Sequence, residues 1–300
     1  MGTVYAADDA ELQRRVALKV LSAPRLDEEA RERMLREARI LARLEHPGIV
    51  PVHDVLSLPD GRVAYAMKLV QGERLDAHAA RVRGLRERLR IFERMCEAVA
   101  FAHTRGVIHR DLKPGNVMVG SFGEVLVLDW GVAKILEGPE DGEAAPPPAE
   151  AHLSMEDAET LIGPPGDPPG GRTRPGTVLG TPGFMSPEQR SGRTELLDAR
   201  ADVYALGVIL RQLVEDAAEP APRRLKALVA KALAPLEDRY PGVEAMASDV
   251  SRFLDDAPVS AYREGPFEAA GRFARRYRGP IALLFTYLVV RWLMFLVAGA

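Results

Sequence analysis

The stretch VIHRDLKPGNVMV, at residues 107–119, places an acid, a cation and an amide within six positions. These are Asp111, Lys113 and Asn116, and a second acid, Asp129, follows thirteen residues after Asn116 in the stretch LDWG. The oxygens of Asn116 and Asp129 are ligands that a hard cation such as Mg²⁺ prefers. A free carboxylate beside such a cation suits a base that accepts a proton from a hydroxyl group. Because a polar loop with a helix cap would not need all four groups together, the stretch predicts metal-assisted chemistry on a hydroxyl.

The elements that hold these four residues are predicted from hydrophobic periodicity and from turn residues. Apolar residues recur at helical spacing in some segments and alternate in others, with turns such as Pro-Asp-Gly between them. The loop that carries Asp111 therefore lies between a predicted helix and a predicted hairpin. The predicted strands occupy residues 1–21 and 49–70, the helices occupy 27–45, 85–104 and most of 187–255, and the hairpin occupies 117–131.

The composition suits a globular chain in a reducing compartment. Of the 300 residues, 47% are hydrophobic and 28% are charged, and the net charge of −3 gives no sign of a nucleic-acid partner. The single cysteine, Cys96, excludes a disulfide within these residues. Since Cys96 stands among Phe92, Met95 and Val99, we expect a buried core thiol rather than a reactive one.

Residues 137–176 differ in composition from the rest of the chain. They contain the stretches PPP and GPPGDPPGG, together with scattered acids. A segment of this kind buries too little apolar area to offset the conformational entropy that is lost when it becomes ordered. We therefore predict that these residues form a disordered insert.

The last 21 residues, 280–300, are apolar apart from one charge, Arg291, and follow a basic segment at 257–279. A helix of this length rises about 30 Å, which is the thickness of a bilayer core. The sequence therefore predicts a single transmembrane helix in the cell membrane, with the basic segment and the domain before it on the cytoplasmic side. A buried C-terminal helix and a helix lying in the membrane interface are the alternatives.

These motifs resemble those of the eukaryotic-type serine/threonine protein kinase family, in its bacterial, membrane-anchored form, over roughly residues 2–255. The stretch VIHRDLKPGNVMV is the most specific of them. The resemblance implies that Asp111 is the catalytic base and that Lys113 contacts the transferred phosphate. It also implies that Asn116 and Asp129 are the metal ligands. The expected cofactors are ATP and Mg²⁺, or Mn²⁺ in place of Mg²⁺.

Two further motifs resemble the part of the family that binds the phosphates of ATP. VALKV implies that Lys19 contacts these phosphates, and REARILARLEHPGIV makes Glu37 the ion partner of Lys19. Gly2 stands where the last glycine of the loop over the phosphates is expected. The residues expected around the adenine are apolar, with Met67 as the gatekeeper before the hinge: Val4, Ala17, Met67, Val70 and Met118.

The second half of the chain resembles the substrate-binding part of the family. GTPGFMSPEQ, at residues 180–189, is similar to the substrate-docking loop. DARADVYALGVIL is similar to the central helix of the large lobe, which implies that Asp202 braces the catalytic loop. DRYP supplies Arg239 as the expected ion partner of Glu188.

The resemblance also implies a regulated activation segment. Arg110 comes directly before Asp111 and leaves a buried positive charge that a phosphate can neutralise. Thr173 and Thr177 are the expected phosphate acceptors, and Thr181 is expected to brace the catalytic loop by hydrogen bonding. Anchored in a plane, two copies of the chain could associate and phosphorylate each other.

The implied fold is α+β and bilobal, with a small lobe at residues 1–70 and a mainly helical large lobe at 71–256. The sheet of the small lobe is expected to be truncated, because its first strand and two glycines of the phosphate loop are missing from the sequence. Either a start codon placed too far downstream or a truly shortened lobe would explain this. Trp130 stands after Asp129, where phenylalanine is usual in the family.

The implied function is transfer of the γ-phosphate of ATP to serine and threonine hydroxyls of protein substrates in bacterial signalling. The expected partners are these substrates, ATP and the cytoplasmic membrane. The main alternative is a pseudokinase or scaffolding module inactivated by the truncation. A pseudokinase predicts the loss of the lysine, the base or a metal ligand, and all of these residues are present. A small-molecule kinase would lack the GTPGFMSPEQ stretch.

Overall fold

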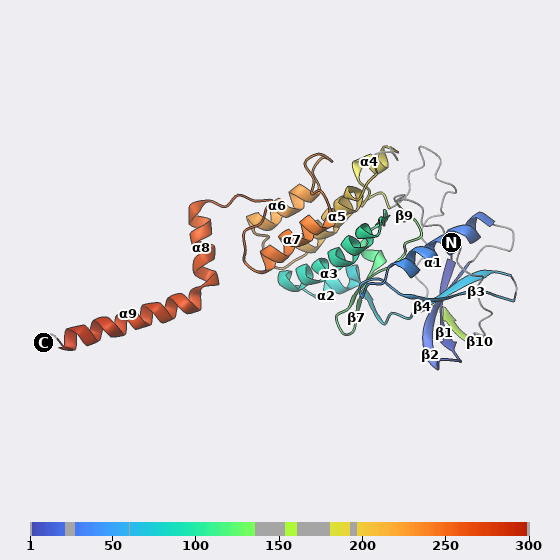
Figure 1. The fold of residues 1–300 in the computed structure, drawn as a ribbon, viewed down its shortest axis with the longest axis horizontal. Helices are drawn as coiled ribbons and strands as arrows, with labels where there is room; N and C mark the ends of the chain where they lie inside the picture. Colours follow the sequence, from blue (N-terminus) through green and yellow to red (C-terminus); the bar gives the residue numbers. More distant parts are fainter. Residues whose placement is uncertain are drawn as a thin grey trace.

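The structure is a computed structural model, and it describes residues 2–21, 28–59, 61–135, 154–160, 181–192 and 197–298. A small, sheet-rich lobe formed mainly by the N-terminal residues lies next to a larger helical lobe (Figure 1). The two-lobed α+β architecture agrees with the fold class predicted from the sequence.

The small lobe is built on a five-stranded sheet in the order β10-β1-β2-β4-β3. The hairpin of β1 and β2 forms because both strands are rich in apolar and β-branched residues and the polar residues between them make the turn. Val16, Leu18 and Val20 are buried in a small core on one face of the sheet. The strands are β1 (Gly2–Asp9), β2 (Arg14–Leu21), β3 (Val52–Ser57), β4 (Val63–Lys68) and β10 (Ser154–Thr160).

The strand β10 belongs to the segment for which the composition predicts disorder. It pairs antiparallel with β1, with Tyr5 opposite Thr160 and Ala6 opposite Glu159. The prediction is therefore wrong for residues 154–160, whereas the rest of 137–176 lies outside the described residues. The physical reason is the open edge of β1, whose backbone groups gain hydrogen-bond partners when a further strand is added. Composition does not reveal such pairing between distant segments.

The helix α1 (Glu28–Arg43) packs beside this sheet and joins it to the core of the large lobe. Its buried residues Met34, Ala38 and Leu41 form the apolar stripe that the sequence predicts. Glu37 lies on the same buried side, with 6% of its surface exposed. The packing of α1 therefore sets the position of this carboxylate relative to the sheet.

The large lobe has the long helix α3 (Leu85–Thr104) at its centre, and its bounds match the predicted helix. Phe92, Met95 and Cys96 of α3 are fully buried, so the expectation for the cysteine is confirmed. Burial raises the pKa of the Cys96 thiol, which keeps it protonated. The other helices of this lobe are α2 (Leu75–Arg81), α4 (Pro187–Arg190), α5 (Arg200–Glu215), α6 (Arg223–Ala232) and α7 (Val243–Leu254).

Short strands at the boundary between the lobes hold the loops that carry chemistry. A three-stranded sheet has the order β5-β7-β8, and β6 pairs with β9. The short helix η1 (Pro114–Asn116) leads directly into β7, so the predicted catalytic loop is fixed at both ends. The strands are β5 (Gly72–Arg74), β6 (Val107–Ile108), β7 (Val117–Gly120), β8 (Val125–Val127) and β9 (Lys134–Ile135).

The C-terminal helices α8 (Pro266–Arg276) and α9 (Arg278–Ala298) extend away from the large lobe (Figure 1). The side chains of residues 278–294 are exposed, and most of them are apolar. Across the described residues, however, no helix combines the length and apolar character that crossing a membrane requires. The transmembrane helix predicted at 280–300 is therefore not confirmed.

Candidate active site

An ion pair links the sheet of the small lobe to α1. Nζ of Lys19, on β2, lies 2.6 Å from Oε1 and 2.9 Å from Oε2 of Glu37. The hydroxyl of Tyr65, on β4, donates a hydrogen bond of 2.9 Å to Oε1 of Glu37. Burial disfavours the charged ammonium, but the carboxylates of Glu37 and Asp129 outweigh it and raise the pKa of Lys19. Lys19 is therefore a fixed cation at the edge of the site.

Asp129 follows β8 and faces the same ammonium group, with Oδ1 at 3.5 Å from Nζ of Lys19. Its backbone is left-handed, with φ at 58°, and 51% of its side chain is exposed. Burial of part of the group favours the acid form, but the nearby charge of Lys19 outweighs this and lowers the pKa of Asp129. An ionised, accessible carboxylate is thus available to a cation.

Trp130, the residue after Asp129, is fully buried. Its indole N–H donates to the carbonyl oxygen of Val127 at 3.3 Å, and its ring packs against His109 with centroids 4.6 Å apart. The larger aromatic side chain therefore packs in the core, whereas the carboxylate of the neighbouring Asp129 remains exposed.

The carboxylate of Asp111 is held by three neighbouring residues. The backbone N–H and the hydroxyl of Thr181 donate to Oδ1 at 2.9 and 3.0 Å, and Nζ of Lys113 donates to Oδ2 at 2.8 Å. Lys113 also donates to the hydroxyl of Thr181 at 2.8 Å. The amide nitrogen of Asn116 donates to Oδ2 of Asp111 at 3.3 Å and to its carbonyl oxygen at 2.9 Å. The structure thus brings the predicted base, lysine and asparagine together, with Thr181 bracing them.

The loop around Asp111 is tied to α5 by one buried carboxylate. Asp202 accepts hydrogen bonds of 2.8 Å from the backbone N–H groups of His109 and Arg110 and lies 2.8 Å from Nε2 of His103. Burial by itself raises the pKa of Asp202, but the hydrogen bond and charge of His103, together with the backbone donor of Arg110, outweigh burial and lower the pKa below its ordinary value. The predicted brace is therefore present, with His103 as an additional partner.

The stretch SPEQ is fixed against the same loop. Ser186 and Gln189 form a capping box at the start of α4, and the side chain of Gln189 donates to the carbonyl oxygen of Arg110 at 3.0 Å. The predicted ion pair is present, with Nη1 of Arg239 at 2.7 Å from Oε1 of Glu188. The expected substrate-docking loop is thus joined directly to the loop that carries Asp111.

Three residues of this arrangement, His103, Gln189 and Tyr65, are missed by the sequence analysis. His103 carries no local signal, because its partner Asp202 is 99 residues away in the sequence. Gln189 could have been found, because Ser-x-x-Gln before a helix is a capping-box pattern. Tyr65 carries no such signal, since an aromatic residue in a strand is usually core. Only the packing of α1 against the sheet shows that the hydroxyl of Tyr65 reaches Glu37.

Asn116 and Asp129 are suited to hold a divalent cation. The backbone N–H of Leu128 donates to the carbonyl oxygen of Asn116 at 2.8 Å, which brings Asp129 next to the asparagine. The amide nitrogen of Asn116 faces Asp111, so its amide oxygen is available to a cation. Among the described residues, no group of three or more His, Cys, Asp or Glu side chains could bind a metal. Mg²⁺ fits such a sparse set, because it takes further ligands from phosphates and water.

The residues expected around the adenine are distributed over both lobes. Ala17 lies opposite Met67 across β2 and β4, and its side chain is buried. Val4 pairs with Lys19, and Met118 lies on β7. The half-buried side chains are those of Val4, Met67, Val70 and Met118.

The remaining predicted residues are placed less completely. Gly2 begins β1, where a Cβ atom would come within 2.9 Å of the carbonyl oxygen of Val20. This close approach favours glycine. Thr173 and Thr177 lie outside the described residues, as does Met1.

Comparison with known proteins agrees with this geometry. A family model described as "Protein kinase domain" matches residues 1–256. The serine/threonine-protein kinase PknD of Chlamydia caviae is 35% identical over 298 residues, covering 86% of the chain and 30% of that protein. PknD of Protochlamydia amoebophila is 30% identical, with 85% and 29% covered. PknD of Chlamydia trachomatis serovar D is 37% identical, with 71% and 23% covered. The chain thus spans less than a third of the length of these relatives.

Proposed function

Because this chain belongs to the eukaryotic-type serine/threonine protein kinase family, we propose that it transfers the γ-phosphate of ATP to serine and threonine hydroxyls of proteins. The observation that carries the proposal is that two groups of charged side chains are both in place in the same structure. Lys19 is paired with Glu37 and faces Asp129, and Asp111 is held by Lys113 and Thr181. Phosphoryl transfer depends mainly on such positioning and on neutralisation of charge.

Each of these residues has a defined part in the reaction. The ammonium of Lys19, oriented by Glu37, attracts the phosphates of ATP. Asn116 and Asp129 would hold Mg²⁺, which supplies neutralisation of the phosphate charge when it is bound. The carboxylate of Asp111 accepts the proton of the substrate hydroxyl. Lys113 lies beside this carboxylate, and its positive charge stabilises the phosphoryl group during transfer.

The contact between Lys113 and Thr181 supports serine and threonine as acceptors. Thr181 opens the docking loop and reaches the carboxylate of Asp111, so the loop that receives the protein substrate is fixed to the base. In the family, a lysine at the position of Lys113 is found in the serine/threonine class. The docking loop also supports protein substrates rather than small molecules, because a small-molecule kinase would lack this loop.

The proposal is tested with Asp111→Asn and Asp129→Ala in a phosphate-transfer assay on peptides with serine, threonine or tyrosine acceptors. We expect the wild-type chain to phosphorylate serine and threonine peptides only, and chelation of Mg²⁺ to abolish the activity. Loss of the base should lower kcat by about 10²–10⁴-fold. Asp216→Asn, at an exposed position on the end of α5, is the matched control. Activity near wild type in either active-site variant would contradict the mechanism, and ATP binding without any transfer would indicate the pseudokinase alternative.

We further propose that phosphorylation of the activation segment between two copies regulates the enzyme. Supporting this, Nε of Arg110 is shielded from solvent and has no hydrogen-bond partner among the described residues, and burial lowers the pKa of this guanidinium. A phosphate on Thr173 or Thr177 would supply the missing negative partner.

This regulation is tested by mixing active chain with the Asp111→Asn chain, which serves only as a substrate. Mass spectrometry of the inactive chain should show phosphate between residues 173 and 181. Phosphate transfer should fall when Thr173 and Thr177 are both replaced by valine. An inactive chain that stays unmodified would contradict the proposal.

The kinase is also proposed to attach to the cytoplasmic membrane through α9. The support is the exposed apolar surface of this helix, which includes Leu283, Phe285 and Met294, and the arginines that precede it. Large exposed apolar patches mark sites of membrane or protein contact. The kinase lobes would then lie on the cytoplasmic side, where ATP is available.

A further inference from the structure

The helix α8 is tied to the large lobe through its charged side. Nε of Arg272 donates to both carboxylate oxygens of Glu264, at 3.1 and 2.9 Å. Nη1 of Arg224, on α6, lies 3.5 Å from the same carboxylate, and its Nη2 lies 2.9 Å from Oδ1 of Asp256. The side chains of Glu264, Arg272 and Arg224 are mostly buried. This network holds α8 in one orientation relative to α6.

The opposite side of α8 is apolar and exposed. Phe267, Phe273 and Tyr277 are 91%, 58% and 41% exposed, and the rings of Phe273 and Tyr277 pack with centroids 4.6 Å apart. Ala270 and Ala274 are exposed as well. These five residues recur at helical spacing, so they share one side of the helix, which we call the aromatic face. A surface helix normally turns its apolar side towards the core, whereas α8 turns it away from the lobe.

The surface around α8 carries an excess of positive charge. Residues 263–278 contain five arginines and two glutamates, a net charge of +3. Both glutamates are engaged within the chain, one by Arg272 and the other by the hydroxyl of Tyr262. Arg263 and Arg278 are exposed, and neither forms an ion pair with a described residue. These two guanidinium groups are therefore available to an anionic partner.

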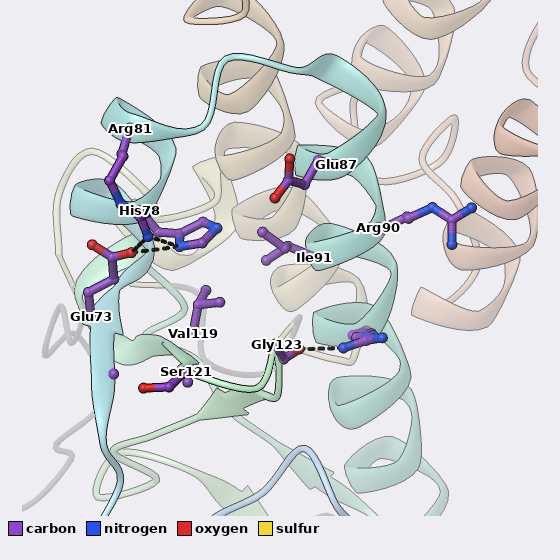
Figure 2. Close-up of a pocket in the computed structure, with 12 residues that line it drawn as sticks. Glu73, His78, Arg81, Glu87, Arg90, Ile91, Val119, Ser121 and Gly123 are labelled. Carbon is purple, nitrogen blue, oxygen red and sulfur yellow. Dashed lines mark hydrogen bonds and ion pairs between the residues drawn. The ribbon is translucent and has the colours of Figure 1, made fainter.

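Two cavities of the large lobe differ in their charge. One, with a volume of about 660 Å³, lies between α2 and α3 (Figure 2). Its arginines face as many carboxylates, namely Arg81, Arg90 and Arg94 against Glu73, Glu87 and, at its rim, Glu124. The other, of about 570 Å³, lies between α6 and α8 and is lined by four arginines and three acids. The first cavity is therefore balanced, whereas the second adds to the positive charge around α8.

The size and the position of the aromatic face indicate a lipid surface rather than a second copy of the chain. The 11 residues of α8 rise about 16 Å, so the aromatic face covers at most a few hundred Å². A stable interface between proteins buries about 800 Å² on each partner. The helix α9, the proposed membrane anchor, begins at Arg278, directly after Tyr277. The aromatic face therefore ends where the chain would meet the membrane.

We propose that α8 lies in the interface of an anionic membrane, parallel to its surface. Phe267 and Phe273 enter the boundary between the headgroups and the acyl chains, where amphipathic interfacial helices place their aromatic residues. Arg263 and Arg278 pair with lipid phosphates and are attracted by the negative surface potential. Because α8 is also tied to α6, this contact sets the orientation of the kinase lobes above the membrane. The proposal rests on the attachment proposed for α9.

The proposal is tested by tryptophan fluorescence of the full chain on vesicles of brominated lipids, since bromine quenches a tryptophan among the acyl chains. Trp292→Phe leaves Trp130, which is fully buried, as the other tryptophan. In this background, Phe267→Trp and Phe273→Trp report on α8, and Phe285→Trp reports on α9. On phosphatidylcholine mixed with phosphatidylglycerol, we expect emission from positions 267 and 273 to fall about twofold. The fall should be much smaller on phosphatidylcholine alone, and it should lessen as the salt concentration rises.

Two matched variants control for position and for charge. Leu12→Trp replaces another exposed apolar residue, in the turn of the small lobe at the opposite end of the molecule (Figure 1), and should not be quenched. Arg263→Glu should lower the quenching at position 267 by about half and leave that at position 285 unchanged. Arg211→Glu, at an exposed position on α5, should change neither. The replaced side chains are exposed, so the melting temperature of every variant should match that of the wild type.

The outcomes separate this proposal from the attachment of α9. Quenching at position 285 without quenching at 267 and 273 would overturn the role of α8 and leave the attachment standing. Absence of quenching at all three positions would overturn both. Equal quenching at 267 on neutral and anionic vesicles, or equal effects of Arg263→Glu and Arg211→Glu, would also overturn the proposal. A change in emission that follows protein concentration without vesicles would assign the aromatic face to a second copy and overturn it too.

Discussion

At the scale of single residues, the site depends on two side chains whose backbone is left-handed. Arg110 has φ at 69° and Asp129 has φ at 58°. Such conformations cost about 1–3 kcal/mol outside glycine and persist where the surroundings fix them. The carboxylate of Asp202 fixes the conformation of Arg110 by accepting a hydrogen bond from its backbone N–H. The ammonium of Lys19 attracts the carboxylate of Asp129 and so holds the second conformation. The strain therefore lies at or directly beside the two carboxylates, Asp111 and Asp129, for which we propose roles in phosphate transfer.

The stabilisation from Asp202 should depend on pH in a defined direction. Its pKa in the folded chain is below the ordinary value of 3.8. The stabilisation is therefore complete above this value and is lost as the pH falls through the lower, folded pKa. We expect Asp202→Asn to lower the free energy of unfolding by about 3 kcal/mol at pH 7. Denaturant unfolding should show the same difference at pH 5 and a smaller one at pH 3.5.

The exposed Asp216→Asn variant serves as the control for these measurements, since its unfolding should match the wild type at each pH. A difference between wild type and Asp202→Asn that does not change between pH 7 and pH 3.5 would show that the charge of Asp202 is unimportant. Loss of packing alone would then explain the effect.

At the scale of elements, the pairing of β10 with β1 joins the insert to the lobe that carries Lys19. Glu159→Pro would remove a backbone donor and disfavour the strand opposite Ala6. We expect faster hydrogen exchange at those amides of β1 that face β10, measured by mass spectrometry of β1 peptides. Ala149→Pro, in the insert but before the strand, should leave exchange in β1 unchanged. Identical exchange in both variants would contradict the pairing.

The elements also show how far the sequence predicts the structure. The helix at 85–104 was predictable to the residue because its apolar positions repeat with helical spacing and all face one core. The strand β10 was not predictable, because it is stabilised by pairing with the edge of β1, which lies more than a hundred residues away in the sequence. The predicted contacts of Lys19, Asp111 and Asp202 depended on motif spacing. The contact of Tyr65 with Glu37 depends on how α1 packs, which spacing does not reveal.

At the scale of the whole molecule, membrane attachment is the property most open to test. We expect deletion of residues 277–300 to release the kinase from membranes in a carbonate wash. The melting temperature of the lobes should not change, because the described side chains of α9 are exposed. Replacing Leu283, Phe285 and Met294 by serine is the matched variant that keeps the length. A full-length chain that washes off as readily as the deletion would exclude attachment through α9.

The buried position of Cys96 has a practical consequence for measuring movement between the lobes. As the sole cysteine in the sequence, it is fully buried and its thiol stays protonated, so maleimide reagents should leave the native chain unlabelled. Pairs of cysteines introduced on the surface, such as one in β3 and one in α6, would then take up dyes or spin labels without background. Distances between the labels would report opening and closing of the two lobes in solution while Cys96 remains in place.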